Sequence, residues 1–156
     1  MARRPARATT DATVRQYAAR GRECAYGNLR LMTRVLGSLY EEALRDVDLH
    51  AGQLQLLWAI VATEPVELGQ LAGLTHTDPT TLSRTVEKLR KARLVDVRAG
   101  TDARRKEVRV TPLGRERFAA AMPRWEVAQR KAAALLPLAE IRTLARQVRR
   151  AAANAP

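Results

Sequence analysis

The chain has 156 residues, enough for one domain or for one domain with an added dimerisation region. It carries 28 Lys and Arg against 16 Asp and Glu, and the net charge of +12 favours polyanionic partners, namely nucleic acid or an anionic membrane surface. The apolar fraction of 46% argues against wholesale disorder. No apolar run reaches the roughly 18 residues that a membrane-spanning helix needs. One cysteine, Cys24, excludes an internal disulfide framework and is typical of a reducing compartment, so we expect a cytoplasmic protein.

The first ten residues are basic, but no apolar segment follows them as it would in a secretory signal. Their composition also resembles that of a transit peptide. We favour a disordered basic tail over residues 1–10.

Helical patterns occupy both ends of the chain. Apolar residues recur at steps of three and four between Cys24 and Leu44, which predicts a long helix over residues 11–46, bent near Gly21 or Gly27. Residues 111–152 predict two more helices, and Pro123 is expected to kink or interrupt the first of them. Such long apolar stripes are best buried against the same helices of a second chain, so we expect a homodimer. The alternative is a monomer that folds its ends onto its own core.

Residues 47–110 contain a different pattern. Two short helices, residues 53–63 and 66–73, precede a turn and a further helix that runs to about Ala92. Asp78 suits the N-cap of this helix and Pro79 its first position. Two β-patterns, residues 94–98 and 107–110, then predict a hairpin. The fold class is therefore mainly α with a small β-hairpin wing: a winged helix-turn-helix with N- and C-terminal dimerisation helices.

The helix after Asp78 separates apolar from polar residues. At 100° per residue, one face carries Leu82, Thr85, Val86 and Leu89 and is expected to point into the core. On the opposite face, small hydroxyl residues and first-turn N–H groups suit phosphate oxygens. Arg84 suits a bidentate contact to guanine, worth roughly 1–3 kcal/mol of discrimination. A merely solvated face is the alternative, but the preceding helix and turn favour DNA binding.

The hairpin is strongly basic. Residues 84–109 hold ten basic and four acidic side chains, a net charge of +6 for this segment. Asp102 is placed to orient Arg104 for a minor groove, and a surface ion pair without function is the alternative. The predicted DNA-binding residues are Thr80, Thr81, Ser83, Arg84, Lys88, Arg98, Asp102, Arg104, Arg105 and Lys106.

The central segment resembles the MarR family of winged helix-turn-helix transcriptional regulators. The matching residues are Leu49 with Gln53, residues 67–71, Thr81-Leu82-Ser83-Arg84, Lys88-Leu89, Leu94-Val95, Asp102-Ala103-Arg104-Arg105 and Val110-Thr111-Pro112-Leu113-Gly114. The resemblance implies a homodimeric repressor on a pseudopalindromic operator of double-stranded DNA, with recognition helices in major grooves about 34 Å apart. It also implies release by a small-molecule effector, and it gives Arg104 the wing-tip contact, braced by Asp102. The chain departs from the family pattern at Ala92, where glycine is usual, and at His50, where threonine is usual.

The sensing function is less clearly indicated by the residues. Cys24 invites a redox-responsive interpretation, but it lies two residues before the sensing position of the family's organic-peroxide-sensing branch, so a buried structural cysteine is the favoured interpretation. Tyr26, Met32, Tyr40, Trp58 and Trp125 are candidates for a ligand pocket, with plain core as the alternative. The sequence contains no metal-ligand spacing, nucleophile–base pair or phosphate loop, so we expect no metal, cofactor or enzymatic activity. A nonspecific or architectural nucleic-acid-binding protein and a protein-interaction module remain as rival functions.

Overall fold

The computed structural model describes residues 6–100 and 105–153. It divides into two compact units, Met1–Ser38 and Leu39–Pro156, which are described separately.

The first unit contains α1 (Ala6–Ala19), the 3₁₀ helix η1 (Arg20–Glu23) and the first part of α2 (Ala25–Leu44). The single helix predicted here is interrupted, because Cys24 adopts an extended conformation with φ −65° and ψ 112°. The interruption lies close to Gly21, one of the two predicted bends. The predicted disorder is wrong for residues 6–10, which belong to α1, and residues 1–5 lie outside the described residues. Cys24 is exposed, so the expectation of a buried cysteine is also wrong for this chain.

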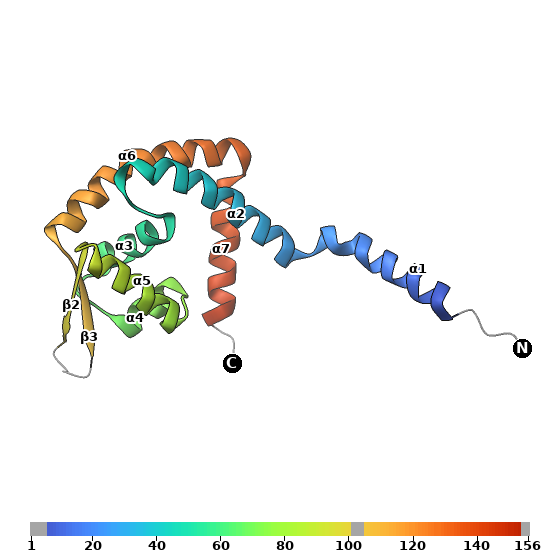
Figure 1. Cartoon of the computed structure of the whole chain (residues 1–156), viewed down its shortest axis with the longest axis horizontal. Coiled ribbons are helices and arrows are strands. Elements are labelled where there is room, and N and C mark those ends of the chain that lie inside the picture. The colour runs from blue at the N-terminus through green and yellow to red at the C-terminus, as the bar shows by residue number, and fades with distance from the viewer. Residues whose placement is uncertain (1–5, 101–104, 154–156) are drawn as a thin grey trace, which may run out of the picture. The chain divides into compact units, whose positions relative to one another are not determined.

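The second unit holds the winged domain (Figure 1). After α2 come η2 (Arg45–Val47), α3 (Ala51–Thr63), β1 (Val66–Glu67), α4 (Leu68–Thr75) and α5 (Pro79–Lys91). The strands β2 (Val95–Ala99) and β3 (Lys106–Val110) form the hairpin, and α6 (Pro112–Leu135) and α7 (Leu138–Ala153) complete the chain. The mainly helical fold with a small β wing is confirmed.

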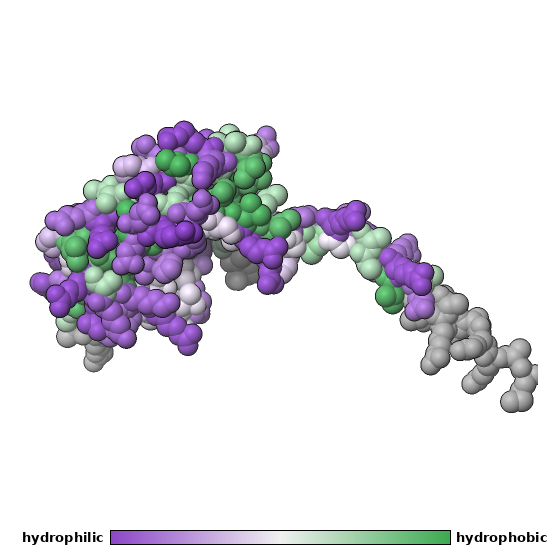
Figure 2. All heavy atoms as spheres, turned by 45° about the horizontal axis from the view of Figure 1, so that its top comes forward, coloured by the Kyte–Doolittle hydropathy of each residue, from purple (hydrophilic) through white to green (hydrophobic). Residues whose placement is uncertain are grey.

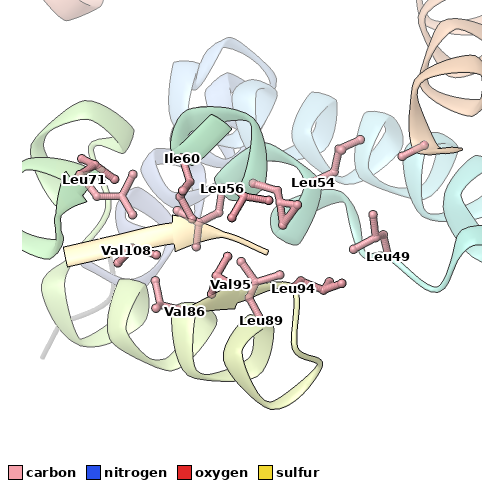
Figure 3. Close-up of a cluster of buried hydrophobic side chains, with 14 of the residues drawn as sticks. Leu49, Leu54, Leu56, Ile60, Leu71, Val86, Leu89, Leu94, Val95 and Val108 are labelled. Carbon is pink, nitrogen blue, oxygen red and sulfur yellow. The ribbon is translucent and has the colours of Figure 1, made fainter. Parts of the chain in front are cut away.

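The core of this unit is built from one face each of α3, α4, α5 and the sheet. Figure 3 shows side chains from these elements converging, among them Ile60, Leu71, Leu89 and Val108, which are 0% exposed. Burying each such side chain contributes roughly 1.5–3 kcal/mol relative to leaving it in water. The core thus fixes α5 and the sheet to the same scaffold.

The sheet has three antiparallel strands in the order β1-β3-β2. The sequence predicts only the hairpin, because the two residues of β1 are too few to show strand alternation and lie within the helix predicted over residues 66–73. Val66 pairs with Val108, and Glu67 pairs with Glu107. This short strand attaches the hairpin to the start of α4.

Helix α6 runs unbroken through Pro123, so the predicted interruption does not occur. The helix contacts the rest of its unit on both sides of the proline. Before it, Arg117 Nη1 donates to the Val47 carbonyl oxygen over 3.1 Å. After it, Lys131 Nζ lies 3.8 Å from Glu42 Oε1, and Ala128 and Ala132 are fully buried.

Apolar side chains remain exposed on the terminal helices. Leu144 and Val148 of α7 are 48% and 58% exposed, and Leu135 at the end of α6 is 60% exposed. In the first unit Leu29 and Leu31 of α2 are about half exposed. Figure 2 shows such apolar patches interrupting a largely hydrophilic surface.

Candidate nucleic-acid interface

The N-terminus of α5 is capped by its own aspartate. Asp78 Oδ1 accepts hydrogen bonds from the N–H groups of Thr80 and Thr81, each over 3.0 Å. The Asp78 carbonyl oxygen accepts from the N–H of Leu82 over 2.9 Å, and Pro79 has no N–H. The first-turn N–H groups are therefore occupied within the chain, and the prediction that they hold phosphate oxygens is corrected. Side chains remain as the means of contact.

The C-terminus of α5 ends in a Schellman motif. The N–H of Leu94 donates to the Leu89 carbonyl oxygen, and the N–H of Arg93 donates to that of Arg90, both over 2.9 Å. The residue in the left-handed conformation is Arg93, with φ 59°, whereas Ala92 has an ordinary φ of −76°. Ala92 itself therefore does not adopt the left-handed conformation, which is taken by the next residue, Arg93.

The two faces of α5 separate as predicted. Leu82, Val86 and Leu89 are 1%, 3% and 0% exposed. Thr85 lies half-buried between the faces, and its hydroxyl donates to the Thr81 carbonyl oxygen over 3.0 Å. The exposed residues include all five predicted contacts on this helix: Thr80, Thr81, Ser83, Arg84 and Lys88.

Glu87 also belongs to the outer face, as the sequence predicts, but it is not among the predicted DNA contacts. Both its carboxylate oxygens accept hydrogen bonds from Arg90, each over 2.8 Å. The Arg90 hydrogen bond, with the charges of Arg90, Lys91 and Lys106, holds the pKa of Glu87 below its ordinary value. This pair is not among the sequence predictions, although the i, i+3 spacing of an acid and an arginine is a signal that could have identified it.

The hairpin has an apolar and a charged face. Val95 and Val97 lie opposite Val110 and Val108, and the alternate positions place Asp96 opposite Arg109 and Arg98 opposite Glu107. On this second, charged face, Arg98 Nη2 lies 3.3 Å from Asp96 Oδ2, and Arg109 Nη2 lies 3.5 Å from Glu107 Oε2. Arg98, a predicted DNA contact, is thus exposed but paired.

Arg105 and Lys106 follow at the start of β3, and both are exposed. Arg105 Nη1 donates to the two carboxylate oxygens of Glu67 over 2.9 and 3.2 Å. Asp102 and Arg104, the predicted wing-tip pair, lie outside the described residues.

The start of α3 is capped by a carboxylate from α2. Glu41 Oε1 accepts from the N–H of Ala51, and Glu41 Oε2 lies 2.9 Å from His50 Nδ1. Burial alone would raise the pKa of Glu41, but the hydrogen bonds from His50 and Ala51 and the charge of His50 outweigh it and hold that pKa below its ordinary value. In addition, Gln53 Oε1 accepts from the N–H of His50 over 2.9 Å. The histidine that stands in place of the usual threonine therefore leaves no uncapped helix end.

The candidate pocket residues fall into separate groups. Trp58 makes edge-on contacts with Trp125 and with Phe118, with ring centroids 5.1 and 5.6 Å apart. Phe118 was not among the predicted pocket residues. Tyr40 belongs to the same unit and is half-buried, and burial raises the pKa of its hydroxyl. Tyr26 and Met32 belong to the first unit, where they are 72% and 41% exposed.

Two kinds of site are not found within residues 6–100 and 105–153. No group of three or more His, Cys, Asp or Glu side chains is placed to hold a metal ion there. In the same described part, no helix has the length and apolarity needed to cross a membrane.

The helix pair α4–α5, the adjoining hairpin and the flanking helices define a winged helix-turn-helix protein. A family model described as the MarR family matches residues 47–105. The structure of the Mycobacterium tuberculosis transcriptional regulator MosR in complex with DNA is similar, with 32% sequence identity and a TM-score of 0.74 over 83% of this chain and 96% of that one. A probable transcriptional regulator from Pseudomonas aeruginosa is 29% identical, with a TM-score of 0.68 over 81% of this chain and 96% of that one.

A mutant of Escherichia coli MarR complexed with operator DNA shares the fold, with 18% identity and a TM-score of 0.73 over 85% of this chain and 96% of that one. A comparison with curated proteins gave no match. The chain belongs to the MarR family of DNA-binding transcriptional regulators, which are not enzymes.

Proposed function

We propose that the protein is a homodimeric, sequence-specific repressor that binds a pseudopalindromic operator and is released by a small ligand. The observation that carries this proposal is the outer face of α5. It is exposed along its length, and within the described part of the chain the Arg84 and Lys88 side chains have no hydrogen-bond or ion-pair partner. These side chains can enter a DNA groove because the opposite face of the helix is buried in the core, which directs them outward.

The residues of this face divide into two roles. Arg84, one turn into the helix, reads a base edge through its planar guanidinium. Lys88, Thr80, Thr81 and Ser83 contact phosphates, which positions the helix without reading sequence. Lys106 adds a phosphate contact from the hairpin, and Arg104, braced by Asp102, takes the minor groove as the family resemblance implies.

The proposed two-fold symmetric dimer carries two copies of this DNA-binding surface. The exposed leucines of α7 and α6 in one unit, and those of α2 in the other, form apolar surface of the kind that a second copy of the chain covers. A ligand that binds beside the Trp58–Trp125 contact would shift α3 against α6 and so alter the spacing of the two recognition helices. We place the protein in the cytoplasm, where its DNA partner and a reduced Cys24 are both found.

The test is a selection from random DNA duplexes with the full-length protein, combined with light scattering for the dimer. We expect one palindromic sequence to be enriched and bound roughly 10³-fold more tightly than random duplex. Uniform binding of all duplexes would support an architectural protein instead. The absence of any duplex binding at low salt would leave only a protein-interaction role.

Cys24 allows a redox-responsive form of the same function to be tested, because its thiol is exposed. If the thiol is the sensor, peroxide should release the wild-type protein from its operator and leave Cys24→Ser bound. Identical behaviour of the two proteins would remove this form and leave the small ligand as the effector.

A further inference from the structure

The charged face of the sheet contains an unfavourable contact. Glu67 of β1 and Glu107 of β3 are directly paired in the antiparallel register, and like charges at such positions destabilise a sheet. Arg105 precedes Glu107 by two residues and therefore emerges on the same face. Its guanidinium reaches diagonally across to Glu67, while Arg109 lies beside Glu107. Each carboxylate thus has its own arginine.

Arg105 and Glu67 form a hydrogen-bonded ion pair between two separate elements. One guanidinium nitrogen bonds both carboxylate oxygens, over 2.9 and 3.2 Å, and the Glu67 side chain is only 28% exposed. The residues are 38 positions apart in sequence, so the pair joins separate elements. Partial burial of the carboxylate reduces the screening that weakens most surface ion pairs.

Arg105 also closes the hairpin through its main chain. Its carbonyl oxygen accepts a hydrogen bond from the N–H of Gly100 over 2.7 Å. A Cβ atom at Gly100 would lie 3.1 Å from Glu107 Oε1, so the chain passes closely over the charged face here. Backbone and side chain of Arg105 therefore bind β2 on one side and β1 on the other.

Glu67 connects this pair to the helix-turn-helix. It is the N-cap residue of α4, with φ −68° and ψ 142°, but its side chain makes no capping hydrogen bond. The carboxylate is directed to Arg105 instead, so α4 and the start of β3 are joined at one residue.

We propose that Arg105 is a positioning residue: with Glu67 it holds the hairpin against α4, so that hairpin and recognition helix meet the DNA as one unit. This inference rests on the proposed DNA-binding function and refines the predicted role of Arg105 as a phosphate contact. The two roles predict opposite changes in DNA affinity when Glu67 is substituted. If Arg105 held a phosphate, removing the competing charge of Glu67 would tighten DNA binding, whereas loss of a positioning pair weakens it.

The test compares Glu67→Gln, Arg105→Gln and the double variant, with Glu116→Gln as the control. Glu116 is exposed on α6 and has no side-chain partner within the described part of the chain. Glu116→Gln changes the net charge by the same amount as Glu67→Gln without breaking an ion pair. We expect each of the first two variants to lower operator affinity about two- to fivefold, as for a partly exposed ion pair. The double variant should lose no more than either single one, and the salt dependence of binding should stay unchanged. Tighter binding by Glu67→Gln, additive losses, or a salt slope lowered by about one in Arg105→Gln would overturn the proposal.

A second measurement needs no DNA. Amide hydrogen exchange of Gly100 and of β3 should be faster in Glu67→Gln than in the wild type and in Glu116→Gln, because the strand is less firmly held. Unchanged exchange would overturn the positioning role even if the protein binds DNA. If exchange is faster in Glu67→Gln but the wild-type protein binds no duplex, the Arg105–Glu67 pair still holds the strand and the proposed DNA-binding function is rejected.

Discussion

The outer face of α5 and the charged face of the hairpin are both rich in basic residues, but they use them differently. On α5, Arg84 and Lys88 have no side-chain partner within the described residues, and only Arg90 is committed to a carboxylate. On the hairpin, Arg98, Arg105 and Arg109 each lie against an acidic side chain. Two of these pairs are local, because Asp96 and Glu107 lie two residues from Arg98 and Arg109 on the same face of one strand, whereas Arg105 reaches across to Glu67 of β1. A count of basic residues therefore overstates how many hairpin charges lie apart from an acidic side chain.

The largest expected effect comes from a residue on which both regions depend. A Cβ atom at Gly114 would lie 2.0 Å from the carbonyl oxygen of Leu94, the residue that joins α5 to β2. We expect Gly114→Ala to lower the free energy of unfolding by about 3 kcal/mol or more, because backbone has to move. Urea denaturation measures this change. Gly69→Ala is the control, since nothing lies within 4 Å of its added methyl group, and equal midpoints for the two variants would contradict the expectation.

The next effect isolates base reading on α5. Arg84→Ala should reduce the preference for the operator over random duplex by about 10- to 100-fold, which corresponds to one lost bidentate base contact. Competition binding with labelled operator gives the ratio. Arg142→Ala on α7, also exposed, should leave the ratio unchanged. A uniform loss of affinity on all sequences would instead place Arg84 on a phosphate.

The third effect concerns the cap that orients α5. Asp78→Ala removes the acceptor for two N–H groups and should lower stability by about 1 kcal/mol, whereas Asp78→Asn keeps an acceptor oxygen and should lie close to the wild type. Thermal unfolding of the three proteins would show the order. Equal losses in both variants would mean that the charge, not the hydrogen bonds, matters.

A smaller effect contrasts the two faces directly. Lys88→Ala should lower the slope of log affinity against log salt by about one, because one phosphate contact is lost. Arg98→Ala should leave this slope nearly unchanged, since its charge already faces Asp96 and Glu107. If both variants change the slope alike, the difference between the faces is not real.

The smallest effect concerns the ion pair between Glu87 and Arg90 on α5. Because the Arg90 hydrogen bond lowers the pKa of Glu87 in the folded chain, the pair contributes its full stability only above the ordinary value of 4.5. This contribution is lost as pH falls through the lower, folded-state pKa. Denaturation of the wild type and Glu87→Gln should therefore differ at neutral pH and converge in acid. A constant difference would show that the substitution acts through something other than this titration.

Local sequence signals predicted most of the recognition helix. Asp78 and Pro79 marked its start, the spacing of Leu82, Val86 and Leu89 identified its buried face, and the same spacing placed Arg84 and Lys88 outside. These features depend on neighbours within one or two turns, so the sequence by itself determined them.

Other features depended on partners distant in the chain. Two-residue β1 acquires its strand character only from pairing with β3, and Glu41 caps α3 from another helix. Helix α6 continues through Pro123, and it contacts residues that are distant in the chain on both sides of the proline. Arg105 was predicted as a phosphate contact from its charge, and only the tertiary structure placed Glu67 beside it. The sequence thus determined where the basic residues lie and which of them have an acidic neighbour close in the chain, as Arg90 has Glu87. The tertiary structure decided the distant pair, because only the fold brings Arg105 and Glu67 together.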